Sequence, residues 1–273
     1  GARGQSVVVL SGGFDLRVGA IAGLASGIIG QFTVRYGLPV EVAVAAGLIF
    51  GTLIGSVNGW LIAAGNLPPF IVTLGMWQIV LAANFLYSKN ATIRSQDIEQ
   101  QAPLLQFLGT TFNIGADADG RGGATFTYGV IAMVLIFAVL SYILSQTAWG
   151  RHVYAVGDDP EAAQLSGVNV KRTIISVYAV TGFICAIAGW ALIGRIGSVS
   201  PTSGQLLNIE SITAVVIGGI SLFGGRGSIM GPLFGALIIG VFTLGLRLAG
   251  ADAQWTFLLI GALIIGAVAV DQW

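Results

Sequence analysis

Residues 42–88 read VAVAAGLIFGTLIGSVNGWLIAAGNLPPFIVTLGMWQIVLAANFLYS and contain no Asp, Glu, Lys or Arg. A helix crosses ~30 Å of hydrocarbon with about 20 mostly apolar residues. These 47 uncharged residues are therefore too many for one crossing and enough for two. The run Gly65-Asn66-Leu67-Pro68-Pro69 interrupts them, because proline cannot continue a helix. We expect two membrane-spanning helices joined at this turn.

The same criterion finds further spans on both sides of this segment. They lie at 18–34, within 122–150, and at 173–194, 205–223, 227–246 and 253–270, which makes eight spans in all. A membrane β-barrel would alternate polar and apolar residues, whereas residues 135–140 read LIFAVL. The expected fold class is all-α, a polytopic integral membrane protein. Because the chain starts without Met and residues 7–13 look like the end of a hydrophobic helix, we also expect the chain to be N-terminally incomplete.

The composition excludes several classes of protein. Of 273 residues, 12 are Lys or Arg and 12 are Asp or Glu, which is 9% charged, and the mean hydropathy is +0.87. Soluble domains have about 25% charged residues, and nucleic-acid binders need a basic surface. A soluble enzyme, a disordered chain and a nucleic-acid binder are therefore excluded. The single Cys185 and single His152 exclude a disulfide framework and a zinc or histidine cluster.

A glycine ladder occurs twice at a constant offset of 176 residues. Glycines spaced four apart form a smooth stripe that lets a neighbouring helix approach closely. The ladders therefore predict helix packing, and their recurrence favours an internal duplication over chance. An odd number of spans between the copies would invert the second one, as in many transporters. The ladders comprise Gly51, Gly55 and Gly59 in the first copy, and Gly227, Gly231 and Gly235 in the second.

Two polar stretches interrupt the apolar pattern. Residues 89–123 hold seven of the 24 charged residues, and Asp117 begins an Asp-x-Asp-Gly run that faintly resembles a calcium loop. Because Tyr128 occupies the twelfth position, where a calcium loop has Glu, a flexible loop is the favoured interpretation. The second stretch, 150–172, predicts a short helix. Asp158 or Asp159 can cap it, Pro160 and Glu161 suit its first turn, Ala162, Ala163 and Leu165 form an apolar face, and Gly167 ends it. A solvated connector is the alternative, but the capping favours docking on a partner.

The chain resembles the permease subunits of bacterial ABC importers for monosaccharides, the ribose, xylose, arabinose and fructose group. Residues 150–168 fill every spaced position of the motif Gly-Arg-x3-Ala-x-Gly-x4-Ala-Ala-x3-Gly-[Ile/Val]. Residues 12–19 resemble Gly-Gly-Ile-Asp-Leu-Ser-Val-Gly, with Phe14 and Arg17 as departures, and residues 67–75 match Pro-Phe-Ile-x-Thr-Leu-Gly. The resemblance covers essentially the whole chain and is strongest to the fructose subgroup.

This resemblance implies a fold of about ten helices with inverted repeats, of which this chain would contain eight or nine. It implies one transmembrane domain over 1–273, with a first half 1–147 that includes an outer loop 88–124, a cytoplasmic coupling loop 148–172 and a second half 173–273. The orientation rests on the resemblance, because five Lys or Arg fall on the expected inner side and seven on the outer side. The implied location is the bacterial inner membrane.

The resemblance also implies partners: a second permease copy, a cytoplasmic ATPase subunit and a periplasmic sugar-binding protein. The chain has no Walker Gly-x4-Gly-Lys-[Ser/Thr] motif, so it is not expected to be an enzyme, and ATP and Mg would bind the partner with no cofactor on this chain. The residues expected to couple to the ATPase are Arg151, Gly157, Asp158, Asp159, Pro160, Glu161, Ala162, Ala163, Leu165 and Gly167.

Polar residues within spans are costly and often functional, so they are candidates for a sugar pathway. These candidates are Asp15, Asn58, Gln78, Asn84, Asn208, Glu210 and Thr213. For Asp15 a helix N-cap is favoured, and for Glu210 an ion pair with Arg195. Trp77, Trp190 and Trp255 could stack on a sugar or lie at the membrane interface. A secondary transporter or channel for a small neutral polar solute, and a purely structural membrane subunit, remain the alternatives to an importer permease.

Overall fold

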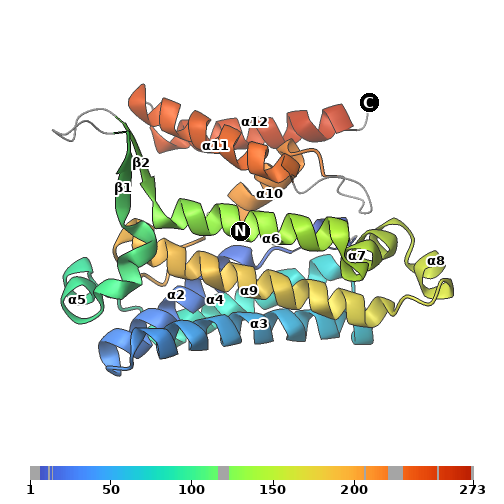
Figure 1. Ribbon diagram of the computed structural model, residues 1–273, viewed down its shortest axis with the longest axis horizontal. Coiled ribbons are helices and arrows are strands. Elements are labelled where there is room, and N and C mark those ends of the chain that lie inside the picture. The colour runs from blue at the N-terminus through green and yellow to red at the C-terminus, as the bar shows by residue number, and fades with distance from the viewer. Residues whose placement is uncertain are drawn as a thin grey trace.

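The computed structural model describes residues 7–11, 13, 15–115, 123–205, 207–220, 230–250 and 252–271. Long helices dominate and run side by side (Figure 1). The first of them is α2 (Val18–Gly30), which continues as a π-helical turn η1 (Gln31–Arg35). α3 (Val40–Gly65) and α4 (Pro69–Ser88) follow, joined at the expected turn, where Asn66 has a left-handed φ of 50° and Pro69 opens α4.

The polar stretch after α4 is built from short elements. It contains α5 (Ser95–Gln101), the 3-10 helix η2 (Pro103–Gly109) and a two-stranded antiparallel sheet of β1 (Thr111–Ile114) and β2 (Ala124–Thr127). The expectation of a flexible loop is wrong for residues 89–115. Ile98 and Leu105 are fully buried, and Ile93 pairs with Val199 beyond α9, so apolar contacts hold this region on the bundle. Residues 116–122, with most of the calcium-like run, lie outside the described residues.

The chain then returns along α6 (Tyr128–Gln146) to the opposite end of the bundle. There α7 (Ala148–Asp158) and α8 (Pro160–Leu165) form the second polar stretch, and α9 (Val170–Ile196) runs back. Figure 1 shows α5 and the hairpin at one end and α8 at the other. The two polar stretches therefore lie at opposite ends of the helices, as two loops on opposite sides of a membrane would.

The last part of the chain consists of α10 (Leu207–Ile217), α11 (Met230–Leu248) and α12 (Ala253–Asp271). The expectation of a full span over 205–223 is wrong for its described part, because α10 has only 11 residues. At 1.5 Å per residue such a helix covers roughly half of the hydrocarbon layer. The α10 helix stops at the Gly218–Gly219 pair, where Gly219 has a φ of 70°.

Five helices in the described part of the chain are long and apolar enough to cross a membrane. They are 18–35, α3, α4, α6 and α9, and 207–217 and 230–246 are shorter apolar helices. The outer helices leave large apolar side chains exposed, for example Leu86 of α4 and Leu135 of α6. Soluble proteins rarely expose such surfaces, so these helices are suited to contact lipid. Mostly helical architecture with several apolar spans is consistent with a polytopic membrane protein.

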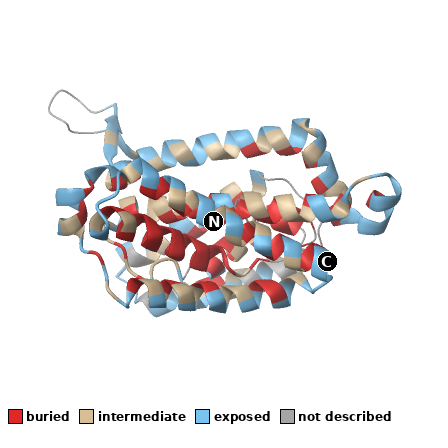
Figure 2. Ribbon diagram, turned by 90° about the horizontal axis from the view of Figure 1, so that it is seen from below, coloured by how far each residue is buried: buried red, intermediate tan, exposed pale blue. Residues whose placement is uncertain are grey.

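The core of the bundle is α2, all thirteen residues of which are buried. It contacts α3, α4 and α9, and Figure 2 shows the buried residues gathered in the middle of the bundle. Small residues make this position possible, since Gly19, Gly23 and Gly27 give α2 a third stripe of glycines four apart. A Cβ on Gly23 would lie 2.7 Å from the backbone oxygen of Ser203, and one on Gly27 would lie 2.7 Å from Asn84 Oδ1.

Candidate functional site

The short helix α8 ends a segment that projects beyond the bundle (Figure 1). Asp159 Oδ1 accepts hydrogen bonds from the backbone N–H groups of Glu161 (2.9 Å) and Ala162 (3.0 Å). Asp159, and not Asp158, is therefore the N-cap residue of this helix. Gly167 follows the helix with a φ of 87°, a conformation that glycine adopts without strain. Together the cap and the terminal glycine define a two-turn element with a fixed start and end.

Most of the predicted coupling residues are exposed on α8 and around it. Leu165 is 91% exposed, which is unusual for a leucine. Ala163 is the exception on α8, because it is only 4% exposed, so the apolar face expected from Ala162, Ala163 and Leu165 is not exposed as a whole. Gly157 is also buried, within α7. The exposed residues are Arg151, Asp158, Asp159, Pro160, Glu161, Ala162, Leu165 and Gly167.

The preceding helix, α7, attaches this element to the bundle. The indole N–H of Trp149 donates a 2.7 Å hydrogen bond to Ser176 Oγ on α9, and Val153 and Val156 are buried. Burial also raises the pKa of the Tyr154 phenol, so this side chain stays neutral at physiological pH. Through its contacts with α6 and α9, α7 connects α8 to two long helices.

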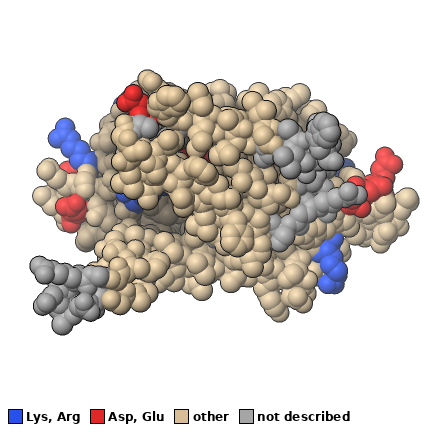
Figure 3. Space-filling model, turned by 90° about the horizontal axis from the view of Figure 1, so that it is seen from above, with Lys and Arg blue, Asp and Glu red and all other residues tan. Residues whose placement is uncertain are grey.

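Charge is concentrated at the two ends of the molecule. Figure 3 shows Lys, Arg, Asp and Glu side chains gathered towards both ends, with a largely uncharged surface between them. Asp158, Asp159 and Glu161 are exposed acidic side chains at the α8 end, and Lys171 and Arg172 begin the next helix as exposed cations. This end therefore offers both charge signs and one apolar side chain to a partner.

Among the pathway candidates, several side chains bond to the protein itself. Asn208 Oδ1 accepts from Gly19 N–H (2.6 Å), and Asn84 donates from Nδ2 to the backbone oxygen of Pro201 (3.1 Å). The Thr213 hydroxyl donates to the backbone oxygen of Ile209 (2.7 Å). All three candidate side chains are buried. The first two bonds tie Asn208 to α2 and Pro201 to α4, and the third lies within α10.

The other polar candidates lie apart from each other. Asn58 is fully buried in α3, and neither of its side-chain polar atoms has a partner within the described residues. Gln78 is exposed on α4. Trp77 and Trp190 are half-buried, and Trp255 is 56% exposed on α12. The structure therefore does not gather the sequence candidates into one cavity.

Arg17 was not among the predicted site residues and appeared in the sequence only as a departure from a family motif. Arg17 is fully buried, and its Nε lies 3.0 Å from Asp15 Oδ1 in an ion pair. Its Nη1 donates to the backbone oxygen of Ile54 (2.9 Å), and its guanidinium lies 5.2 Å from the Tyr178 ring centroid. Asp15 also accepts from Arg17 N–H (3.0 Å) at the start of α2. The pair joins α2, α3 and α9. Its sequence signal was an Arg two residues after an Asp, directly before an apolar run.

The first glycine ladder faces α9. A Cβ on Gly51 would lie 2.7 Å from Ala186 Cβ, and a Cβ on Gly59 would lie 2.7 Å from Ile175 Cα. Gly55 lies directly against the backbone oxygen of Tyr178. In the second ladder, Gly231 of α11 lies against Gly218, just beyond the end of α10, and Gly235 lies against Ala214 inside α10. Gly227 lies outside the described residues. Glycine thus sets both close approaches.

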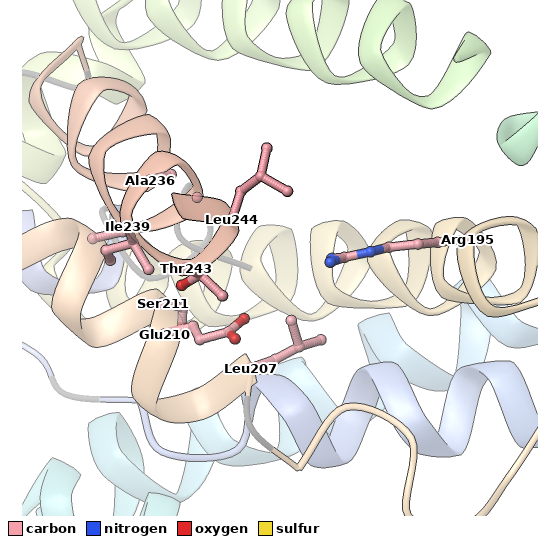
Figure 4. A pocket seen from close by; sticks show the side chains of 10 residues that line it. Arg195, Leu207, Glu210, Ser211, Ala236, Ile239, Thr243 and Leu244 are labelled. Atoms are coloured by element: carbon pink, nitrogen blue, oxygen red, sulfur yellow. The ribbon is translucent and has the colours of Figure 1, made fainter. Parts of the chain in front are cut away.

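A pocket of about 350 Å³ lies between the end of α9, α10 and the second half of α11. Figure 4 shows the guanidinium of Arg195 and the carboxylate of Glu210 pointing towards one another across it. The expected ion pair between Arg195 and Glu210 stays a prediction. The lining residues are Arg195, Leu207, Glu210, Ser211, Ala214, Ala236, Ile239, Gly240, Thr243 and Leu244.

Residues 2–268 match the family described as branched-chain amino acid transport system / permease component. The chain is 67% identical to the fructose import permease protein FrcC of Rhizobium meliloti, over 98% of this chain and 73% of that protein. It is 37% identical to the ribose import permease protein RbsC of Bacillus subtilis, over 99% of this chain and 80% of that protein.

A more distant relative is the xylose transport system permease protein XylH of Escherichia coli K12. It is 31% identical, over 99% of this chain and 81% of that protein. No solved structure matches the chain. Within the described residues no group of three or more His, Cys, Asp or Glu side chains is arranged to hold a metal ion. The matched relatives are permease subunits, and each similarity extends over almost the whole chain.

Proposed function

The chain belongs to the family of branched-chain amino acid transport system permease components, and from this we propose that it is the membrane-spanning permease subunit of an ATP-driven monosaccharide importer. Fructose is the first sugar to test, because the relative at 67% identity is a fructose import permease. As a member of this family with several apolar helices, the chain is a multi-pass membrane protein. Import into a bacterial cell would place it in the inner membrane.

The proposed assembly contains two permease copies, an ATPase subunit that binds ATP and Mg, and a periplasmic binding protein that delivers the sugar. The observation that supports ATPase docking most directly is the exposure of Leu165 on α8, a capped helix that projects at one end of the bundle. An exposed leucine among charged residues suits a partner's apolar pocket with a polar rim. The loop 148–172 would then lie in the cytoplasm and the loop 88–124 outside.

In this proposal, closure of the ATPase moves α8, and α7 transmits the displacement to α6 and α9. Rigid-body movement of packed helices is a common form of switching. A neutral sugar needs hydroxyl partners along its pathway and no fixed counter-charge. Buried Asp15 and Arg17 neutralise each other, so they do not act as an unpaired ionisable relay.

The function is tested by uptake of radiolabelled fructose and ribose into proteoliposomes that contain this chain, its cognate ATPase and its binding protein. We expect sugar accumulation that requires ATP on the side of the membrane that carries the ATPase. It should also require the binding protein on the opposite side. Accumulation of sugar without the ATPase subunit would contradict the proposal and favour a secondary transporter or channel.

The docking surface is tested by Leu165→Glu on α8. Because a buried charge without a partner is costly, we expect the ATPase to be lost from the purified complex and uptake to fall at least tenfold, a factor equivalent to about 1.4 kcal/mol. The matched control is Leu104→Glu, since Leu104 is 55% exposed in η2 at the opposite end. Retention of the ATPase by Leu165→Glu would rule out docking at α8.

A further inference from the structure

The hairpin of β1 and β2 separates apolar and polar side chains onto two faces, because successive side chains of a strand point to opposite sides. The register of the two strands places four side chains together on what we name the apolar ribbon face, which consists of Phe112, Ile114, Ala124 and Phe126. The opposite, polar face consists of Thr111, Asn113, Thr125 and Thr127. Neither strand contains Asp, Glu, Lys or Arg.

The apolar ribbon face is open in the described part of the chain. Ile114 is 58% exposed and Phe126 is 37% exposed. Phe112 is half-buried, because its ring centroid lies 6.1 Å from that of Phe126 and 5.3 Å from that of Tyr128. A two-stranded hairpin by itself is marginally stable in water and needs a surface on which its apolar side can pack. The rings contact each other, so this face needs a partner.

The same group of rings continues to the start of α6. Tyr128 is the first residue of this helix, and its ring is stacked on that of Phe107, with the centroids 4.8 Å apart. α6 has 19 residues, and at 1.5 Å per residue its length is close to the ~30 Å of the hydrocarbon layer. Tyr128 therefore lies at the boundary between membrane and water, where aromatic side chains are enriched.

The direction of the hairpin fits this boundary. Figure 1 shows β1 and β2 leaving the start of α6 sideways, across the common direction of the long helices. Because the long helices cross the membrane, a ribbon that leaves them sideways runs along the membrane surface. Val130 and Val134, in the first two turns of α6, are exposed apolar side chains, and they extend the lipid-contacting surface of this helix up to the hairpin.

We propose that the hairpin lies on the surface of the bilayer, with its apolar ribbon face in the boundary between headgroups and acyl chains. Amphipathic helices lie in the same way, with the apolar face about 5–10 Å deep in this boundary. A protein partner would need a polar rim around an apolar centre, whereas the polar side chains of both strands lie on the opposite face. The contact fixes the start of α6 relative to the membrane and does not depend on which solute the permease carries.

Spin labelling tests which medium covers this face. The single native thiol, Cys185, is fully buried, so a nitroxide reagent would label an introduced cysteine. The full chain with Ile114→Cys is labelled and reconstituted in phosphatidylcholine vesicles. We expect oxygen, which concentrates in hydrocarbon, to relax this nitroxide more strongly than a water-soluble nickel chelate does. The matched control is Thr111→Cys, on the same strand and the polar face, where the nickel chelate should have the stronger effect.

Three results would overturn the proposal. A stronger effect of nickel at both positions would place the whole ribbon in water. Weak effects of both reagents on Ile114→Cys would mean that protein, for example a second copy of the chain, covers the face. Because the strands contain no Lys or Arg, the result should be the same in vesicles that also contain phosphatidylglycerol. A preference for oxygen that requires this anionic lipid would mean electrostatic attraction in place of apolar burial.

A second substitution in the labelled Ile114→Cys chain tests the same contact by removing it. Phe126→Asp puts a charge on the apolar ribbon face, and a charge is costly in the membrane. We therefore expect the effect of oxygen on the nitroxide to fall below that of nickel. Thr111→Asp puts the same charge on the polar face and should leave the preference for oxygen unchanged. An unchanged preference with Phe126→Asp would contradict the proposal.

Discussion

At the scale of single residues, the ion pair of Asp15 and Arg17 explains why two charged side chains occur at the centre of an apolar bundle. Both side chains are completely buried, and Arg17 adds a hydrogen bond to Ile54 and a contact with the Tyr178 ring. Burial of either charge alone would be strongly unfavourable. The pair therefore holds α2 against α3 and α9, and its most direct consequence is stability.

Removal of one partner should be more harmful than removal of both. We expect Asp15→Asn and Arg17→Gln each to lower the free energy of unfolding by about 3–5 kcal/mol, because each leaves an uncompensated buried charge. The double variant should lose less than the sum of the two losses. Thermal unfolding of the purified protein in detergent measures these values, and additive losses would show that the two side chains do not stabilise each other.

At the scale of elements, the packing of α3 against α9 depends on glycine. Gly55 of α3 lies against the backbone oxygen of Tyr178, where no side chain fits, whereas Gly75 of α4 has open space in the Cβ direction. Both glycines lie inside helices, so replacement by alanine gains the same helix propensity at each position. The difference between the two substitutions therefore measures the close approach alone.

We expect Gly55→Ala to destabilise the protein by about 1–3 kcal/mol, since overpacking forces the two backbones apart. Gly75→Ala should be neutral or should stabilise by about 0.5–1 kcal/mol, because it relieves the entropy cost of a helical glycine. Both are measured by thermal unfolding under the same conditions. Equal effects of the two substitutions would mean that Gly55 does not set the α3–α9 distance.

At the scale of the whole molecule, α8 and the pocket between α9, α10 and α11 lie at opposite ends of α9. The helix begins at Val170, next to α8, and ends at Ile196, one residue after Arg195 of the pocket. A displacement of α8 can therefore reach the pocket through a single rigid helix and through α7. The hydrogen bond from Trp149 to Ser176 is the polar link between α7 and α9 in this path.

We expect Trp149→Phe to retain the ATPase subunit and to lower the ratio of sugar transported to ATP hydrolysed by at least twofold. The aromatic ring still packs, but the 2.7 Å hydrogen bond to Ser176 is lost, and such a bond contributes about 0.5–1.5 kcal/mol. Trp255→Phe, at an exposed tryptophan of α12, is the matched control. An unchanged ratio for Trp149→Phe would remove α7 from the coupling path.

The sequence by itself determined the class of the protein, the positions of the five long apolar helices in the described residues, and the existence of a capped short helix at α8, while the structure decided that Asp159 is its cap. These features follow from local physical chemistry: hydrocarbon thickness sets the length of apolar runs, proline ends helices, and Asp, Pro and Gly mark the ends of a short helix. Composition was sufficient to exclude soluble and nucleic-acid-binding proteins. The family resemblance rested on motifs in the sequence, and the comparisons confirm the family.

Only the tertiary structure decided which polar side chains are available to a solute. In the sequence, Asn84, Asn208 and Thr213 cannot be distinguished from residues that line a pathway. In the structure, each side chain makes a hydrogen bond to a backbone group, either distant in the chain or one helical turn away. Whether α10 is long enough to span the membrane depended on where this helix ends. Lipid and the protein interior are both apolar, so hydrophobic periodicity does not indicate which face of a helix is buried in this protein.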